Sequence, residues 1–468
     1  MATRTRREFF SNMVDGLHGA ALATLIGGEL AQASSFDLKP RPAHFPGKAK
    51  AVIHLFMNGG PSQVDLFDPK PALTRLAGTA PSRELSFAIS NGKDAGLLMP
   101  SPFTFNRHGK SGMELSSAMP HVAECADDIA LIRSMYGEHA NHEPALFLMH
   151  SGRTIASRPS MGAWVSYGLG TENKNLPAYV VLDDPKGLPI NGISNWQSAW
   201  LSPIFQGTRF RTEGPPVLNL QPRAEIPTPL MEAERKLIGK LDAAHLQRRP
   251  FQPELDARIS SYELAARMQI AASDALDLGK ESEATREAYG LNDVATESYG
   301  KRCLMARRLV ERGVRFVQLY IENQIFDSHG DLTGSLNYAC GKTDKPIAAL
   351  LKDLKQRGLL DSTLVVYGGE FGRLPISQGP MKTAGRDHGP NGFSIWMAGG
   401  GIKGGTVYGA TDDIGFKAAE NPVSVHDFHA TMLYLLGLDH RKLALERQGL
   451  NERLTDQFPA RVVKEIIA

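Results

Sequence analysis

Residues 344–367 read DKPIAALLKDLKQRGLLDSTLVVY, and this stretch decides the class of fold. Its first half carries apolar residues at positions i, i+3, i+4 and i+7, the spacing of a helix that buries one face. These apolar residues are Ile347, Leu350, Leu351 and Leu354. The last five residues, TLVVY, have the length and composition of a short buried strand. The stretch therefore predicts a helix that is followed directly by a strand.

The ends of this helix are also marked in the sequence. Asp344 can cap its N-terminus, and Pro346 fits its first turn, where no backbone N–H is needed. Gly358 ends it, because glycine readily adopts the left-handed conformation that closes a helix. Near the end of the chain, Ser424 and Asp427 have the spacing of a capping box, which predicts another helix start.

The same order of elements occurs just before this stretch. We expect a helix over residues 304–311, a stop at Gly313, and a strand over residues 314–320 (VRFVQLY). A further buried strand is expected at residues 50–57 (KAVIHLFM), which run into the turn-forming NGGP. Alternating helices and strands predict an α/β fold with a doubly wound, mostly parallel sheet and helices on both of its faces.

The amino-acid composition changes between about residues 215 and 299. This stretch is charged and rich in alanine, and its apolar positions 230, 237, 238 and 241 fit a helical period. We interpret it as a mainly helical insertion within one α/β domain that spans residues 34–468. The sequence leaves open whether this insertion is a lid over a site or only a buttress.

Composition excludes several classes of function. The chain has 468 residues, 42% of them hydrophobic, which is enough for a sizeable core. Its 52 basic and 50 acidic residues nearly cancel, so no nucleic-acid partner is expected. No run approaches the roughly 20 apolar residues of a membrane span, so we expect no transmembrane segment. The three cysteines, at 125, 303 and 340, are too scattered for a disulfide framework, a zinc cluster or an iron–sulfur centre.

The N-terminus has the pattern of an export signal. Two arginines at 6 and 7 precede two phenylalanines, an apolar segment follows over residues 19–30, and Ala-Gln-Ala at 31–33 resembles a cleavage site. We interpret residues 1–33 as a twin-arginine signal peptide, which implies the twin-arginine export machinery as a partner and a periplasmic or otherwise exported location. The alternative is an ordinary amphipathic helix.

Polar residues follow the expected strands. In open α/β sheets, ligands bind beyond the carboxyl ends of the strands, so these residues are expected to gather at one edge. They are Asn58 and Asp65 after the first strand, Asp327 and His329 after the second, Glu370 after the third, and His388 shortly beyond. Carboxylates mixed with imidazoles suit zinc, manganese or iron. Simple turn capping is the alternative for the aspartates, and a buried salt bridge to Arg373 or Arg386 is the alternative for Glu370.

A second group of polar residues lies between 134 and 153. It holds three histidines within twelve residues, His139, His142 and His150. We expect His139 or His142 to have a role at the site, since the two could lie on one helical face or in a loop there. The alternative is a solvated loop.

Several long motifs resemble those of the domain-of-unknown-function family 1501. They include HLFMNGGPSQVDLFDPKP (54–71), SMGAWVSYGLG (160–170), FDSHGDL (326–332), GGEFGRLP (368–375), GRDHGPNGFSIWMAGGGIKGGTVYGATDD (385–413) and HDFHATMLYLLGLD (426–439). The resemblance covers roughly residues 48–440. This family in turn looks like a distant branch of the alkaline phosphatase and sulfatase superfamily. The resemblance implies a doubly wound α/β fold and, in the hydrolytic relatives, two metals at the strand ends.

The resemblance carries over only in part. Asp327, His329 and His388 look like kept metal ligands. Asn58 stands where relatives have an aspartate, and Phe371, after Glu370, stands where they have a histidine. The resemblance therefore implies one well-formed metal site and a second that is weak, absent, or rebuilt from His139, His142 or Asp65.

The position of the nucleophile also differs. Ser151-Gly152-Arg153 looks like the triplet that follows the nucleophile in relatives, and counting back from it reaches His142, which has no hydroxyl or thiol. We therefore expect attack by metal-bound water, or by a serine such as Ser62, with His142, His139 and Arg386 as candidate catalytic residues. Candidates for holding an anion are Arg133, Arg153, Arg373 and Arg386, since arginine forks match phosphate and sulfate oxygens.

Two functions remain in competition. The first is an exported, metal-dependent hydrolase of phosphate or sulfate esters, which acts on a small anionic ester or on a sulfated or phosphorylated glycan. Its cofactor is one or two divalent ions per chain, of zinc, manganese, calcium or magnesium. The alternative is a non-catalytic binding or assembly protein that keeps the fold and a structural metal.

Overall fold

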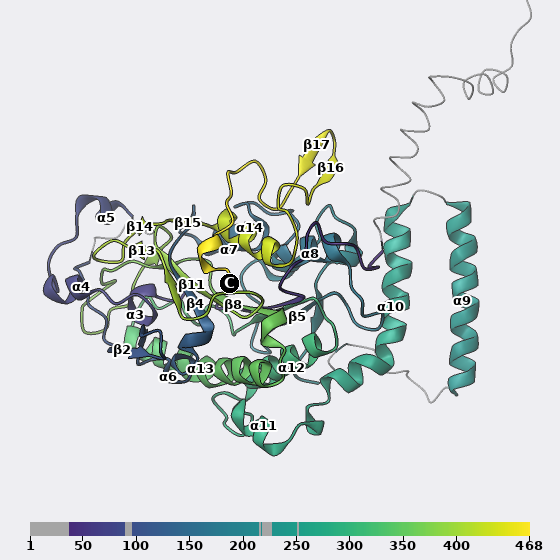
Figure 1. Cartoon of the computed structure of the whole chain (residues 1–468), viewed down its shortest axis with the longest axis horizontal. Coiled ribbons are helices and arrows are strands. Elements are labelled where there is room, and N and C mark those ends of the chain that lie inside the picture. The colour runs from purple at the N-terminus through teal and green to yellow at the C-terminus, as the bar shows by residue number, and fades with distance from the viewer. Residues whose placement is uncertain (1–36, 89–95, 215–216, 218–226, 250–251) are drawn as a thin grey trace, which may run out of the picture.

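The computed structural model describes residues 37–88, 96–214, 217, 227–249 and 252–468 (Figure 1). The expected signal peptide, residues 1–33, lies outside the described residues. The part of the chain that is described forms one central sheet of nine strands, in the order β12-β4-β11-β8-β1-β7-β5-β6, with β15 also paired to β4. The strands are β1 (Ala51–Phe56), β4 (Ile129–Tyr136), β5 (Tyr179–Leu182), β6 (Thr208–Phe210), β7 (Phe316–Tyr320), β8 (Thr363–Gly368), β11 (Phe393–Ala398), β12 (Thr406–Tyr408) and β15 (Val423–Ser424).

Most strand pairs of this sheet are parallel. Only β11 runs antiparallel to its neighbours, β4 and β8. The strands β1, β7 and β8 lie side by side, and Phe56 of β1 pairs with Tyr320 of β7 and with Gly368 of β8. The three strands therefore end at the same level, and the loops that follow them emerge next to one another.

Helices cover both faces of the sheet, which confirms the predicted doubly wound architecture. One face packs against α6 (Pro120–Ala123), α12 (Glu297–Glu311) and α13 (Leu332–Gln356). The other packs against α7 (His142–Ser151), α8 (Met161–Leu169) and α14 (Val425–Leu435). Figure 1 shows the two sets of helices on opposite sides of the strands. Ser424 and Asp427 form the predicted capping box at the start of α14.

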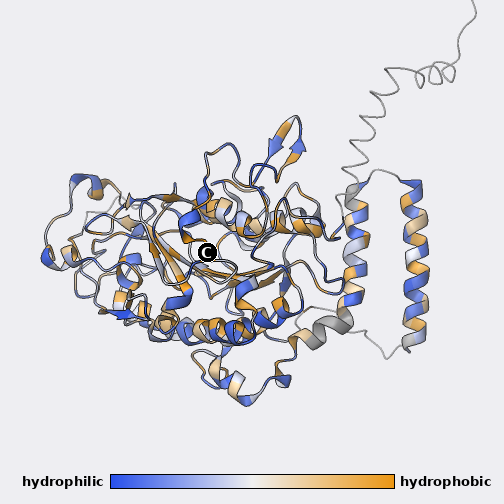
Figure 2. Cartoon of the chain, viewed as in Figure 1, coloured by the Kyte–Doolittle hydropathy of each residue, from blue (hydrophilic) through white to orange (hydrophobic). Residues whose placement is uncertain are grey.

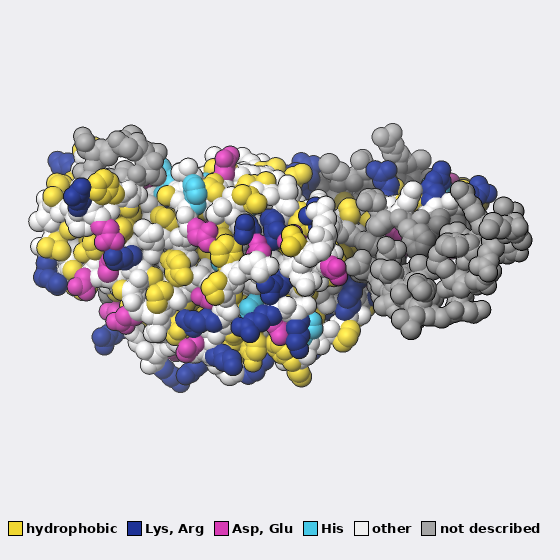
Figure 3. All heavy atoms as spheres, turned by 90° about the horizontal axis from the view of Figure 1, so that it is seen from above, with side chains coloured by type: hydrophobic (Ala, Val, Ile, Leu, Met, Phe, Trp, Pro, Cys, Tyr) yellow, Lys and Arg dark blue, Asp and Glu magenta, His cyan; other side chains and the backbone are white. Residues whose placement is uncertain are grey.

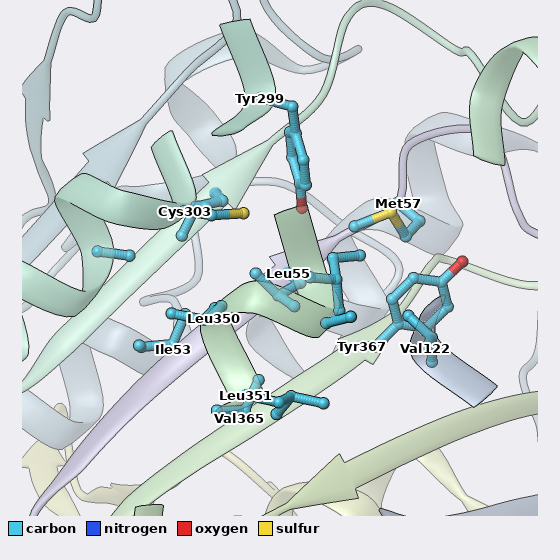
Figure 4. Close-up of a cluster of buried hydrophobic side chains, with 14 of the residues drawn as sticks. Ile53, Leu55, Met57, Val122, Tyr299, Cys303, Leu350, Leu351, Val365 and Tyr367 are labelled. Carbon is cyan, nitrogen blue, oxygen red and sulfur yellow. The ribbon is translucent and has the colours of Figure 1, made fainter. Parts of the chain in front are cut away.

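Alternate side chains of β1 enter the two cores. Ile53 and Leu55 lie among Leu350 and Leu351 of α13 and Cys303 of α12 (Figure 4). Val52 and Phe56, at the alternate positions of the strand, contribute to the core on the opposite face. A strand that is buried on both sides reads as a continuous apolar run, which explains why residues 50–57 contain almost no polar residue.

The start of α13 differs from the prediction. The helix begins at Leu332, with Asp331 as its N-cap, and Pro346 lies inside it. Proline removes one hydrogen bond from a helix interior, but the apolar face continues through Leu336 and Ala339, so packing on the sheet outweighs that loss. The C-terminal end agrees with the prediction, since Gly358 follows the helix with a φ of 66°.

Asp344 caps a different helix from the predicted one. Its carboxylate accepts hydrogen bonds from the backbone N–H groups of His121, at 2.8 Å, and Val122, at 2.7 Å, in the first turn of α6. Burial raises the pKa of Asp344, although these two N–H groups oppose the shift. The Asp344 side chain thus links α13 to the first turn of α6.

Residues 228–288 are mainly helical. They form α9 (Thr228–Arg248), α10 (Pro253–Leu276), the 3-10 turn η5 (Leu278–Lys280) and α11 (Glu283–Ala288). Ala257 and Met268 of α10 are buried, whereas residues 229–248 of α9 are exposed or half-buried. The two long helices run side by side at one end of the molecule, with α9 outermost (Figure 1).

Smaller elements complete the fold. They are α3 (Gln63–Leu66), α4 (Pro71–Arg75), α5 (Arg83–Phe87), and the two-stranded pairs β2 (Phe105–His108) with β3 (Met113–Ser116), β9 (Gly372–Arg373) with β10 (His388–Gly389), β13 (Ala410–Thr411) with β14 (Ala418–Glu420), and β16 (Leu445–Arg447) with β17 (Leu450–Glu452). Basic and acidic side chains are interspersed over the described part of the face in Figure 3. Among the described residues, no helix has the length and apolarity needed to cross a membrane.

We predict that Asp344→Ala lowers the free energy of unfolding by about 1–3 kcal/mol, because two backbone N–H groups of α6 lose their acceptor. Urea unfolding followed by circular dichroism measures the change. Asp361→Ala, at an exposed position, is the control and should leave the stability within about 0.5 kcal/mol. Equal stability of the two variants would contradict the capping role.

Candidate metal centre

Four loops bring polar side chains together at the carboxyl edge of the sheet. Asp327 and His329 lie in the loop after β7, and Glu370 follows β8. The short hairpin of β9 and β10 pairs His388 with Arg373 and so returns His388 to the same edge. His142 is the first residue of α7, which follows β4.

The loop after β1 must approach the loop after β7 closely. Gly59 has a φ of 99°, a conformation that other residues rarely adopt. A Cβ atom at this position would lie 2.6 Å from the backbone nitrogen of Asp327. Gly59 therefore allows the loop after β1 to pack against the loop after β7 at the site.

The carboxylate of Asp327 is the centre of the cluster. Its Oδ1 atom lies 2.9 Å from Nε2 of His329 and 3.2 Å from Nε2 of His388, and these two nitrogens are 3.1 Å apart. Its Oδ2 atom lies 3.3 Å from Nε2 of His142. Ligands at about 2.0–2.1 Å around a tetrahedral ion such as zinc are about 3.3 Å apart, so this spacing is close to that of a metal shell.

Each of the three imidazoles is fixed by an acceptor at its other nitrogen. Nδ1 of His388 lies 2.6 Å from the carbonyl oxygen of Ala140, and Nδ1 of His142 lies 2.7 Å from Oε1 of Glu370. Nδ1 of His329 pairs with the side-chain oxygen of Gln378. These oxygens accept, so Nδ1 carries the proton and Nε2 of a neutral imidazole presents a lone pair.

The arrangement of these donors suits a bound cation. Three imidazole lone pairs and a carboxylate that can only accept point at one another, which is repulsive unless a positive charge lies between them. Histidines that bind a metal have this arrangement, with the second nitrogen held by a carboxylate or a backbone carbonyl. Two overlapping groups, one of His142, Asp327 and His388 and one of His329, Asp387 and His388, thus fit a divalent metal such as zinc.

Protons on the histidines can supply the positive charge that a metal would otherwise bring. Burial lowers the pKa of His142, but hydrogen bonds to Asp327 and Glu370 outweigh it and raise that pKa to about 9. A hydrogen bond to Asp327 raises the pKa of His329, whereas burial lowers the pKa of His388. Burial alone would raise the pKa of Asp327, yet its bonds to the histidines and the charge of Arg373 hold it well below its usual range.

Arg373 supplies a fixed positive charge beside the carboxylate. It is fully buried, and its guanidinium lies 2.6 Å from Oδ1 of Asp327. It also donates to the carbonyl oxygens of Gly59 and Gly60. Arg373 therefore both positions Asp327 and holds the loop after β1.

A second set of donors, made of oxygens, adjoins the histidines. Oε1 of Glu370 accepts from the backbone N–H of Gly59 at 2.9 Å and from Nε2 of Gln324 at 3.3 Å. Among the described residues, Oε2 of Glu370 and the side-chain oxygens of Asn58 and Gln324 are buried without a hydrogen-bond partner. A buried acceptor without a partner costs about 1–3 kcal/mol. Carboxylate and amide oxygens suit magnesium, calcium or manganese, so these three fit a second, harder cation.

Most of the predicted site residues meet here. The structure brings Asp327, His329, His388, Glu370 and His142 together and places Asn58 beside Glu370 through Gly59. His139 is exposed and lies in the loop before α7, where its ring accepts the N–H of Asn141 at 3.0 Å.

Asp65 and Arg386 are placed differently from the prediction. They are fully buried and pair with each other, with Nε 2.7 Å from Oδ2 and Nη2 3.0 Å from Oδ1. Asp65 is thus occupied as an acceptor instead of binding a metal, and Arg386 neutralises it instead of facing a substrate.

The other arginines expected to hold an anion are also engaged by the protein. Arg133 donates to the carbonyl oxygen of Phe67 at 2.9 Å, and Arg153 lies 2.9 Å from the carboxylate of Asp456. Arg373 pairs with Asp327, as described above. Any anion at this site would therefore be held by groups other than these arginine forks.

Three residues of the site were missed by the sequence reasoning. Gln324 and Gln378 are neutral amides in loops, and nothing in the sequence distinguishes them from solvated glutamines. Asp387 lies close enough to His329 and His388 to share an ion with them. Its position directly before His388 was a usable signal.

A family model described as "Protein of unknown function (DUF1501)" matches residues 49–467. No curated protein matches this chain. Solved structures show only distant similarity. They include the PsFucS1 sulfatase from Pseudoalteromonas sp. (12% identity, TM-score 0.36, covering 88% of this chain and 70% of that one), the lipoteichoic acid synthase LtaP from Listeria monocytogenes (10%, 0.34, 87% and 77%) and the alkaline phosphatase of the Antarctic bacterium TAB5 (10%, 0.33, 83% and 98%). Similarity this low assigns neither an activity nor a residue role to the chain.

We predict that removing metal makes the stability pH-dependent between pH 6.5 and 9. The folded-state pKa of His142, about 9, exceeds the unfolded value of 6.5, so its protonation stabilises the metal-free fold below pH 6.5 and is lost as the pH rises through 9. The loss is of the order of 2–3 kcal/mol at most. Thermal unfolding of chelator-treated and metal-loaded protein across this range measures it.

The metal-loaded protein is the control, since the metal takes the place of the proton and its melting temperature should not fall in this window. His142→Ala should flatten the profile of the metal-free protein. A metal-free profile that is already flat in the wild type would contradict the proposed environment of His142.

Proposed function

This chain belongs to the DUF1501 family of proteins of unknown function, and we propose that it is a metal-dependent hydrolase of phosphate or sulfate esters. One observation carries the proposal: the Nε2 atoms of three imidazoles converge on the carboxylate of Asp327, two at Oδ1 and one at Oδ2, and the Nδ1 atom of each is held by an acceptor. The site is also open to solvent on one side, because the side chain of His329 is 34% exposed.

The residues of the site divide into those that would bind the metal and those that would transfer a proton. Asp327, His329 and His388 would hold the metal, which when bound supplies a Lewis acid that polarises the ester and activates water. His142 is held at Nδ1 by Glu370, so its Nε2 is oriented toward the centre of the cluster and can take up or give back a proton there. Glu370 then acts as the group that orients the proton-transferring histidine.

The start of helix α7 favours an anionic substrate. Helix α7 begins at His142, and Asn141 at its N-cap leaves the first turn without a side-chain cap. The N-terminus of a helix attracts anions through its unpaired N–H groups and its dipole. Together with a divalent metal, it can hold phosphoryl or sulfuryl oxygens without an arginine fork. Small anionic esters and sulfated or phosphorylated glycans both present such a group.

A second candidate function is a binding or assembly protein with a structural metal. It is favoured because the four arginines expected to hold an anion are all paired with groups of the protein. It is also favoured by the position of His142, which could serve as a further ligand beside Asp327, His329 and His388. Four protein ligands close a tetrahedral shell, and a closed shell is typical of structural zinc. Export by the twin-arginine route stays a prediction from residues 1–33 and belongs to both candidates.

The two candidates make opposite predictions for His142→Ala. In the hydrolase, the variant keeps its metal and loses about 10²–10⁴-fold in kcat/KM, because a proton-transfer group is gone. His139→Ala, at the exposed histidine of the same loop, is the matched control and keeps both metal and activity. The measurements are metal content by plasma mass spectrometry and turnover of p-nitrophenyl phosphate, p-nitrophenyl sulfate and bis(p-nitrophenyl) phosphate.

In the structural-metal protein, His142→Ala loses metal, and the metal-replete wild type hydrolyses none of these esters. His329→Ala should lose metal under either function. Retention of full metal content by His329→Ala would contradict the metal centre itself.

A further inference from the structure

Helix α9 carries an apolar stripe that the described residues leave uncovered. Leu230, Leu237, Ile238 and Leu241 are 53–61% exposed, although large apolar side chains at a helical spacing normally face a core. Figure 2 shows apolar and polar residues alternating along this outermost helix. The candidate metal centre makes no use of this stripe, so its presence calls for a separate explanation.

The helix has two distinct sides. One side faces α10, where Arg235 donates to the carbonyl oxygen of Ala266 at 3.1 Å. The half-buried residues of α9 recur on that side, at Met231, Arg235, Asp242 and Leu246. Residues on the opposite side are exposed and recur with spacings of four and three. We call them the outer stripe, and they are Leu230, Glu234, Leu237, Leu241, Ala244 and Arg248.

Spacings of four and three are those of a coiled-coil seam. The outer stripe has leucine or alanine at four of its six positions and a charged residue at the other two, Glu234 near the N-terminal end and Arg248 near the C-terminal end. A parallel copy would place Glu234 against the partner's Glu234 and Arg248 against the partner's Arg248. Both contacts are repulsive, so a parallel pair is disfavoured.

An antiparallel copy turns both charges into favourable contacts. With Leu237 opposite the partner's Leu241, the leucines form the centre of the seam. Glu234 then lies about one helical turn from the partner's Arg248, within reach of these long side chains. We therefore propose that two copies of this chain associate through an antiparallel pairing of their α9 helices along the outer stripe.

The expected affinity is modest. A helix of 21 residues is about 30 Å long, and one helix against another buries less than the roughly 800 Å² per partner of a standard interface. We expect a dissociation constant in the range of about 1–100 µM, so the dimer forms and separates within an accessible concentration range.

Sedimentation equilibrium of the purified full-length chain, from about 1 to about 300 µM, tests the proposal. The wild type should pass from monomer to dimer, and Leu237→Glu/Leu241→Glu should remain monomeric. Lys236→Glu/Gln247→Glu, which adds two glutamates to exposed positions away from the outer stripe, is the matched control and should dimerise as the wild type does. Circular dichroism confirms that each variant is folded.

A charge exchange separates the antiparallel pair from other contacts. Glu234→Arg alone and Arg248→Glu alone should each weaken the dimer by about 3- to 10-fold, and the two together should restore it. A monomeric wild type at every concentration would overturn the proposal and leave a different protein as the partner of α9. A wild-type dimer that survives Leu237→Glu/Leu241→Glu would overturn it as well, since the contact would then lie elsewhere.

Discussion

The carboxylate of Asp327 is the interaction on which the rest of the site depends. It accepts from Arg373 and lies within 3.3 Å of the Nε2 atoms of three histidines, whose other nitrogens are fixed by Ala140, Glu370 and Gln378. Every oxygen around these imidazoles accepts, so the lone pairs that the fold assembles need a positive charge. A proton on His142 supplies that charge in the metal-free protein, and a divalent metal would supply it if one is bound.

The sheet makes this convergence possible. β1, β7 and β8 end at one level, so Asn58, Asp327 and Glu370 emerge from neighbouring strands although they are far apart in the chain. The β9–β10 hairpin then returns His388 to the same edge, and Arg373 on the facing strand pairs with Asp327. The candidate metal centre is thus assembled from the loops at the strand ends.

The sheet and part of the site could be predicted from local patterns alone. Repeated units of helix, glycine and strand specify a parallel sheet, and the residues that follow its strands include Asp327, His329 and Glu370. The start of α13 could not be read in this way, because Pro346 resembles a first-turn proline while the packing that extends the helix involves distant residues. Asp65 was misplaced for a similar reason: its partner, Arg386, lies 321 positions away, and only the folded chain brings the two together.

X-ray absorption spectroscopy at the edge of the bound metal is the most direct test of a metal held by Asp327 and the histidines. We predict a first shell of nitrogen and oxygen atoms at about 2.0–2.1 Å, with the outer-shell scattering of at least two imidazole rings. A shell of oxygen atoms without imidazole scattering would contradict this metal centre.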